Sequence, residues 1–315
     1  MQFMADLDRN EDGGLQIMYG IDGRRDLTET IREDRGGYGG AQPVRLGNGA
    51  FDQRQNDVYG AALDAVLLHS RRSQRIPRRL WPLVLAQAEC ATAVWRQPDQ
   101  GIWEARGKPR CYVSSKLMCW VALDRAARLA NIAGEAALAA TWVETAAEIK
   151  SDILEHGVSE RGVLRQHYDT DALDASTLLA AIFGFLPPDD ARLRATVLAI
   201  ADELSEHGFV LRYRTEETDD GLSGKEGHLS HLLLLARVGV GADRRDTAGK
   251  SADGAPREGR ITARPLRGGA RRRASRHLGN FPQAFSHLAL VEAAARIIVA
   301  ESVTELAGEP GREGD

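Results

Sequence analysis

The stretch "SSKLMCWVALDRAARLANIAGEAALAATWVETAAEIKSDILEH" (residues 114–156) decides the fold class. Apolar residues recur in it at intervals of three and four, which is the period of an amphipathic helix. We therefore expect two long helices, over 114–133 and 135–156, joined by a short turn. The same period predicts helices over 55–70, 79–96, 172–185, 190–207 and 282–303. Since strand signals are nearly absent, the sequence predicts an all-α fold.

Long polar loops and short turns alternate between these helices. This alternation suits a closed toroid of helical hairpins, in which the long loops gather on one face. Function usually lies on loops that a rigid scaffold positions. The long loops are therefore the first place to look for chemistry.

The composition excludes some classes of protein. The 315 residues are 43% hydrophobic with a net charge of −4, which gives no reason to expect a nucleic acid or an anionic membrane as partner. The three cysteines form no CxxC pair and are expected to be reduced, in or near a core. The acidic start "MQFMADLDRNEDGG" is unlike a signal peptide, and no apolar run approaches the ~20 residues of a membrane span. We expect a soluble cytoplasmic protein.

Two loops carry candidate chemistry. In "DQGIWEARGKP", Trp103 and Glu104 lie between two glycines. A carboxyl group against an aromatic face is partly desolvated, which favours the protonated form that a general acid needs near neutral pH. The alternative is a surface glutamate beside a tryptophan that fills the core. In "VLRYRTEETDDGLSGKEG", Arg212 and Tyr213 emerge from an apolar run and could point into a cleft and bind hydroxyl groups, although charge runs of this kind are usually solvated.

Six long motifs occur in order along the chain: "LQIMYGIDGRRDLTE", "VRLGNGAFDQRQNDVYG", "GIWEARGKPRCYVSSKLMCWVALDRA", "GFLPPDDARLRATV", "LRYRTEETDDGLSGKEG" and "LGNFPQAFSHLALV". Together they resemble glycoside hydrolase family 15, and most of all its bacterial trehalases and glucoamylase-like members. The resemblance implies an (α/α)6 barrel, a six-hairpin toroid, that hydrolyses α-glucosidic bonds with inversion.

The resemblance also implies roles for single residues. Glu104 matches the acid glutamate of the family's "WE" loop, and Trp103 would form a wall beside it. Arg212 matches the substrate-binding arginine of an "RY" pair more closely than Arg214 does, and Tyr213 completes the pair. The chemistry needs no metal and no organic cofactor. The implied partner is a small saccharide, trehalose or an α-gluco-oligosaccharide, and no nucleic acid or membrane.

Two departures from the family pattern bear on activity. The chain begins after the family's N-terminal β-sandwich and its "W-x-R-D" motif, so we expect one partial catalytic domain over 1–315, incomplete at its N-terminus. A separate upstream chain with the missing half is a candidate partner. The second departure is the segment 228–276, since between Arg237 and Arg276 twelve Lys or Arg stand against four Asp or Glu.

The segment 228–276 is best explained by a shifted reading frame. Permitted codons for "HLSHLLLLAR", read one nucleotide out of frame, encode the family-like "TFLICSFWL". We therefore expect family-like structure over 1–227 and 277–305, disorder over 228–276 and a tail over 306–315. The general base would fall near Arg267 and Gly268, where no carboxylate exists, so activity should be impaired.

Several alternatives remain open at this point. The enzyme could be a glucoamylase or glucodextranase acting on α-linked oligosaccharides. The chain could be a non-catalytic remnant or a sugar-binding helical protein. The basic segment could instead be a genuine insert that binds nucleic acid or a partner, in which case binding would depend on salt.

Overall fold

The computed structural model describes residues 1–37, 40, 42–71, 73–206 and 209–217, together with 228–229, 270–271, 276–277, 288, 291 and 295. The longer described helices are α2 (Asp57–Arg71), α3 (Trp81–Val94), α4 (Val113–Ala133), α5 (Ala136–His156) and α7 (Ala191–Glu203). Short helical segments are α1 (Gln2–Asp6), η2 (Arg78–Leu80), η3 (Ala175–Leu178) and α6 (Leu179–Ile182).

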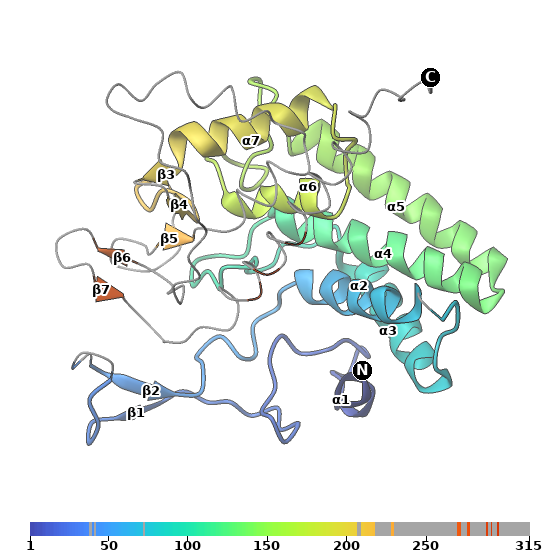
Figure 1. Ribbon diagram of the computed structural model, residues 1–315, viewed down its shortest axis with the longest axis horizontal. Helices are drawn as coiled ribbons and strands as arrows, with labels where there is room; N and C mark the ends of the chain where they lie inside the picture. Colours follow the sequence, from blue (N-terminus) through green and yellow to red (C-terminus); the bar gives the residue numbers. More distant parts are fainter. Residues whose placement is uncertain are drawn as a thin grey trace, which may run out of the picture.

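The described strands are short and antiparallel. β1 (Thr30–Arg32) pairs with β2 (Val44–Leu46), and Ile31 lies opposite Arg45. β3 (Ser205–Glu206), β4 (Phe209–Leu211) and β5 (His228–Leu229) form a second sheet in that order, and β6 (Ala270–Arg271) pairs with β7 (Arg276–His277). Figure 1 shows the β1–β2 hairpin apart from the helices, whereas the β3–β4–β5 sheet follows the end of α7.

Helix α4 lies at the centre of the helical layer. It packs against α2 and α3 on one side and α5 on the other, and it also contacts η3 and α6 (Figure 1). Sixteen of its 21 residues are buried. A helix that is covered on nearly all faces belongs to the interior of a large core. The N-terminus of α4 follows the loop that carries Trp103 and Glu104, so the core holds that loop at one end.

Two glycines fix the position and length of α4. Gly60 of α2 lies so close to α4 that a Cβ atom there would be 2.4 Å from the carbonyl oxygen of Met118. Gly134 ends α4 with a φ of +85°, and its N–H donates to the carbonyl of Ala130. A left-handed glycine after the last turn is a common way to end a helix, because glycine has no Cβ to oppose that backbone.

The long helices were predicted well from sequence. α2, α4 and α5 begin and end within two residues of the expected 55–70, 114–133 and 135–156, and α3 with η2 covers most of 79–96. The expected helix over 172–185 is wrong in extent. The Asp174 side chain caps the 3₁₀ helix η3 instead, α6 follows with four residues, and Gly184 then takes a φ of +69°.

The expected helix over 190–207 is too long. α7 ends at Glu203, and strand β3 begins at Ser205. The helical expectation for 282–303, the disorder expected over 228–276, the family-like segment 277–305 and the tail 306–315 fall outside the described residues, apart from the few positions given above. Among the helices that the model describes, none has the length and apolar character to cross a bilayer.

Candidate active site

The loop between α3 and α4 carries Trp103 and Glu104, and hydrogen bonds between its two arms close it. Asp99 and Arg110 form an antiparallel bridge there, with N–H···O distances of 3.0 and 2.9 Å. Gly101 turns the chain with a φ of +69°, and a Cβ atom at this position would lie 2.9 Å from the ring of Tyr112. Only glycine fits so close to the ring. The bridge and the glycine together hold the tip of the loop in one conformation.

Glu104 has an unusual backbone conformation. Its φ is +58°, and its N–H donates to the carbonyl of Gly101 at 3.3 Å. The Nδ2 group of Asn48 donates to the carboxylate, at 3.2 Å to Oε2 and 3.4 Å to Oε1. A left-handed backbone at a residue other than glycine is unfavourable, and such residues cluster at functional sites. Sequence reasoning placed Glu104 on this loop but did not find Asn48.

Asn48 is held in place by the turn after β2. Gly47 has a φ of +80°, and a Cβ atom there would lie 2.4 Å from the carbonyl oxygen of Leu27. The Oδ1 atom of Asn48 accepts from the N–H of Ala50 at 2.9 Å, which leaves its Nδ2 group to face Glu104. The two glycines of "LGNGA" were the signal in the sequence, because they indicate a tight turn around a polar side chain.

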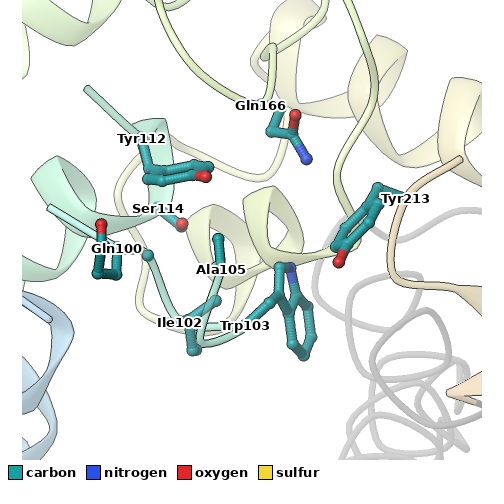
Figure 2. A pocket seen from close by; sticks show the side chains of 9 residues that line it. Gln100, Ile102, Trp103, Ala105, Tyr112, Ser114, Gln166 and Tyr213 are labelled. Atoms are coloured by element: carbon teal, nitrogen blue, oxygen red, sulfur yellow. The ribbon is translucent and has the colours of Figure 1, made fainter. Parts of the chain in front are cut away.

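Trp103 and Arg212 lie together although they are far apart in sequence. The guanidinium carbon of Arg212 is 5.1 Å from the centre of the Trp103 ring, within the range of a cation–π interaction. Tyr213 is buried next to the indole (Figure 2). Arg214 is directed elsewhere, since its guanidinium donates to the carbonyl of Glu203 at the end of α7. Of the two arginines, Arg212 is the one that lies over the Trp103 ring.

A cavity of about 10 Å³ lies behind the loop, which is room for about one water molecule and too small for a sugar. Figure 2 shows its lining, which consists of Gln100, Gly101, Ile102, Trp103, Ala105, Tyr112, Ser114, Gln166 and Tyr213. None of these described residues is acidic. Glu104 is not among the residues that line this cavity.

Two carboxyl groups lie beneath the loop, that of Asp99, which is buried, and that of Asp57, which is partly buried. Asp99 Oδ2 accepts from the N–H of Asn56 at 2.8 Å, just before α2 begins. Burial raises the pKa of Asp99 to about 7, and the neighbouring Asp57 carboxylate adds to the rise, while the bond from Asn56 opposes it. Burial also raises the pKa of Asp57 to about 6. The base of the loop therefore changes its charge near neutral pH.

The raised pKa of Asp99 predicts a pH-dependent stability. The folded protein keeps a proton on Asp99 that the unfolded chain releases above the ordinary pKa of 3.8. The contribution of this group to stability is therefore fully present below about pH 4 and is lost as pH rises through about 7. Asp99→Asn keeps a carbonyl oxygen for the N–H of Asn56 and does not ionise. We expect its Tm to fall less than that of the parent chain between pH 5 and pH 8, by a few degrees.

The control for this prediction is Asp189→Asn, on an exposed turn before α7. Its Tm should follow that of the parent chain at every pH. If Asp99→Asn and the parent chain lose equal amounts of Tm between pH 5 and pH 8, Asp99 does not titrate in this range.

Comparison with known proteins identifies the family. The sequence model of the family described as "Glycosyl hydrolases family 15" matches residues 1–243 of this chain. The chain belongs to glycosyl hydrolase family 15. The all-α prediction is confirmed, since the described fold is helix-rich and agrees with part of an (α/α)6 barrel, the architecture expected for the family.

Relatives of this family 15 chain support the assignment. It is 50% identical over 321 residues to a trehalase of Mycobacterium tuberculosis, an alignment that covers 97% of this chain and 45% of the relative. A trehalase of Thermoplasma volcanium is 33% identical over 296 residues, with 91% and 46% covered. A solved glycosidase variant in complex with glucose has a TM-score of 0.55 and 27% identity, and covers 67% of this chain and 56% of its own.

The family 15 chain spans about half the length of the curated relatives it matches. Arg267 and Gly268, where the general base was expected, lie outside the described residues. Within the residues that the model describes, no group of three or more His, Cys, Asp or Glu side chains is placed to hold a metal ion. The described part therefore presents the candidate acid, its tryptophan and the candidate sugar-binding pair.

Proposed function

We propose that this chain supplies the acid side of an inverting α-glucosidase site of the trehalase type. Glu104 is the general acid, Trp103 is the wall beside it, and Arg212 and Tyr213 bind sugar hydroxyls. One observation supports this assignment above the others. In a family 15 chain, the Arg212 guanidinium lies over the Trp103 ring, next to a glutamate held in a left-handed backbone conformation.

Inversion requires two carboxyl groups. One protonates the leaving oxygen, and the other activates a water molecule on the opposite face of the sugar. The expected place of the base, near Arg267 and Gly268, carries no carboxylate. General-base catalysis is typically worth about 10²–10⁴-fold in rate. We infer that the chain binds an α-glucoside and hydrolyses it slowly.

The substrate proposed first is trehalose, because the relatives at 50% and 33% identity are trehalases. A glucoamylase- or glucodextranase-type substrate, an α-linked glucose oligosaccharide, is the alternative, and a non-catalytic remnant is the other. The proposed chemistry needs no metal or organic cofactor. An upstream chain that completes the barrel and a cytoplasmic location remain part of the proposal.

Azide distinguishes these possibilities. It is a nucleophile that needs no base, so it can take the place of the water molecule that the missing carboxylate would activate. Azide forms a bond to C1 from the face opposite the leaving oxygen, the C1–O bond breaks, and the proton of Glu104 passes to that oxygen. Trehalose then yields β-glucosyl azide and glucose. We expect slow release of glucose from trehalose, and at least about tenfold faster release with azide, given the size of base catalysis. Proton NMR identifies the azide product and its configuration.

The same assay with maltose and isomaltose tests the alternative substrates. Fast glucose release without azide would contradict the missing base. If none of the three sugars binds or reacts, with or without azide, the sugar site itself is contradicted and the remnant interpretation is favoured.

A further inference from the structure

Asp174 is a buried carboxylate at the point where three loops meet, and it is 1% exposed. Its Oδ1 atom accepts from Trp103 Nε1 at 2.9 Å and from the N–H of Ser176 at 2.7 Å. Its Oδ2 atom accepts from Gln166 Nε2 at 3.1 Å. All three donors are neutral, and one of them is the indole of the proposed sugar wall.

The next residue along the chain holds the sugar-binding arginine. The N–H of Ala175 donates to the carbonyl of Arg212 at 2.7 Å. Two consecutive residues therefore hold the pair. The side chain of Asp174 binds the indole N–H of Trp103, and the main-chain N–H of Ala175 binds the carbonyl of Arg212. These two hydrogen bonds help to fix the distance of 5.1 Å between the Arg212 guanidinium carbon and the centre of the Trp103 ring.

Gln166 extends the same network to the core. Its carbonyl accepts from the N–H of Val113, the first residue of α4, at 3.0 Å. It lines the small cavity together with Trp103 and Tyr213, and Figure 2 shows the side chains of all three around it. The carboxylate of Asp174 thus connects the loop of Trp103 to Gln166, whose main chain contacts the start of the buried helix α4. The link to Arg212 runs through the main-chain N–H of Ala175.

Capping alone does not account for an aspartate at this position. Asp174 is the N-cap of η3, and a single acceptor oxygen, such as that of serine or asparagine, is enough for that role. Burial of a carboxylate is costly unless hydrogen bonds satisfy it, and here the bonds reach beyond the cap to the indole and to Gln166. The indole bond fixes the ring orientation, which packing of a flat ring against a sugar requires.

We propose that Asp174 is a positioning residue whose carboxylate fixes the Trp103 wall relative to Arg212, the residue that the adjacent Ala175 N–H holds. This inference rests on the proposed function for its effect on sugar, but the hold on Trp103 is independent of it. Without the carboxylate, the indole can turn and the wall is displaced. A displacement of about 1 Å in a positioning group can cost up to about a hundredfold in rate.

The test separates capping from the hold on the indole. In Asp174→Ser the short hydroxyl keeps the cap on η3 but does not reach Trp103. In Asp174→Asn one oxygen still accepts from Trp103 and Ser176, and the amide of Gln166 can turn to accept from the new NH2 group. Asp190→Ser is the matched control, because Asp190 caps α7 through the N–H of Arg192 at 2.9 Å.

The first readout is the set of indole N–H signals in a 15N-tryptophan-labelled protein, which has five tryptophans. Trp103→Phe identifies the signal of Trp103 by its disappearance. We expect Asp174→Ser to shift this signal upfield and to speed its exchange with solvent, because a bond to a carboxylate is lost. Asp174→Asn should keep the slow exchange, and Asp190→Ser should leave the signal unchanged.

The second readout is azide-assisted cleavage of trehalose. We expect Asp174→Ser to lower kcat by about tenfold to a hundredfold at unchanged folded fraction by circular dichroism, and Asp174→Asn to recover most of the rate. An unchanged Trp103 signal in Asp174→Ser, or an equal shift in Asp190→Ser, would overturn the proposal. If the parent chain neither binds nor cleaves sugar, the proposed function fails, whereas the indole signals still decide whether Asp174 holds Trp103.

Discussion

Glu104→Gln is expected to stop azide-assisted cleavage of trehalose while α-glucosyl fluoride continues to react. Glutamine keeps the size of the side chain and an oxygen that accepts from Asn48 Nδ2. It has no proton to give to the sugar oxygen that leaves trehalose, whereas fluoride leaves without a proton. We expect a loss of about 10²-fold or more with trehalose and only a small change with the fluoride. Release of glucose and of fluoride in the presence of azide measures the two rates.

Glu148→Gln is the matched control, because Glu148 lies on α5 in an exposed ion pair with Arg96 at 2.8 Å. Both substrates should react with this variant as they do with the parent chain. If Glu104→Gln slowed both substrates equally, Glu104 would have a binding role and another group would supply the proton. If neither substrate were affected, Glu104 would lie outside the site.

Of the substitutions proposed here, Gly60→Ala should lower the Tm the most. An alanine in an exposed helix normally stabilises by up to about 1 kcal/mol relative to glycine. At this position the added methyl group would lie 2.4 Å from the carbonyl oxygen of Met118, which belongs to the backbone of the central helix and cannot turn away. Overpacking of this kind costs about 1–3 kcal/mol, so we expect a Tm lower by about 3–10 °C in thermal unfolding.

Ala61→Gln is the control for Gly60→Ala, since Ala61 is the next residue of α2 and is exposed. Its Tm should stay within about 2 °C of the parent value, because surface substitutions away from special features have small effects. If the Gly60→Ala protein were as stable as the parent chain, α2 and α4 would have to lie further apart than the 2.4 Å between an added Cβ at residue 60 and the Met118 carbonyl oxygen implies.

Periodicity was sufficient for the long helices. The apolar spacing in 114–156 located α4 and α5 almost to the residue, because each packs one or more faces into the core along its whole length. It was not sufficient for 172–185, where Asp174 caps a 3₁₀ turn and buried Ser176 and Thr177 face the core. There, side-chain hydrogen bonds to the backbone decided the conformation, and the hydrophobic pattern does not encode them.

The site was predicted only in part for a similar reason. The motif around Trp103 and Glu104 is continuous in sequence, so it was visible. Asn48 and Asp174 reach this loop from 56 and 71 residues away, and nothing in a single sequence connects them. Each did carry a local signal, since glycines flank Asn48 and "DAS" beginning at Asp174 is a capping sequence.

The left-handed backbone at Glu104 sets stability against the proposed role of this residue at a single position. Any side chain there opposes that conformation by about 1 kcal/mol, and glycine alone would relax it. Selection for heat resistance would therefore favour Glu104→Gly, and the selected proteins would lack the proposed proton donor. A screen for thermostable descendants of this chain needs a counter-selection on turnover from its first round.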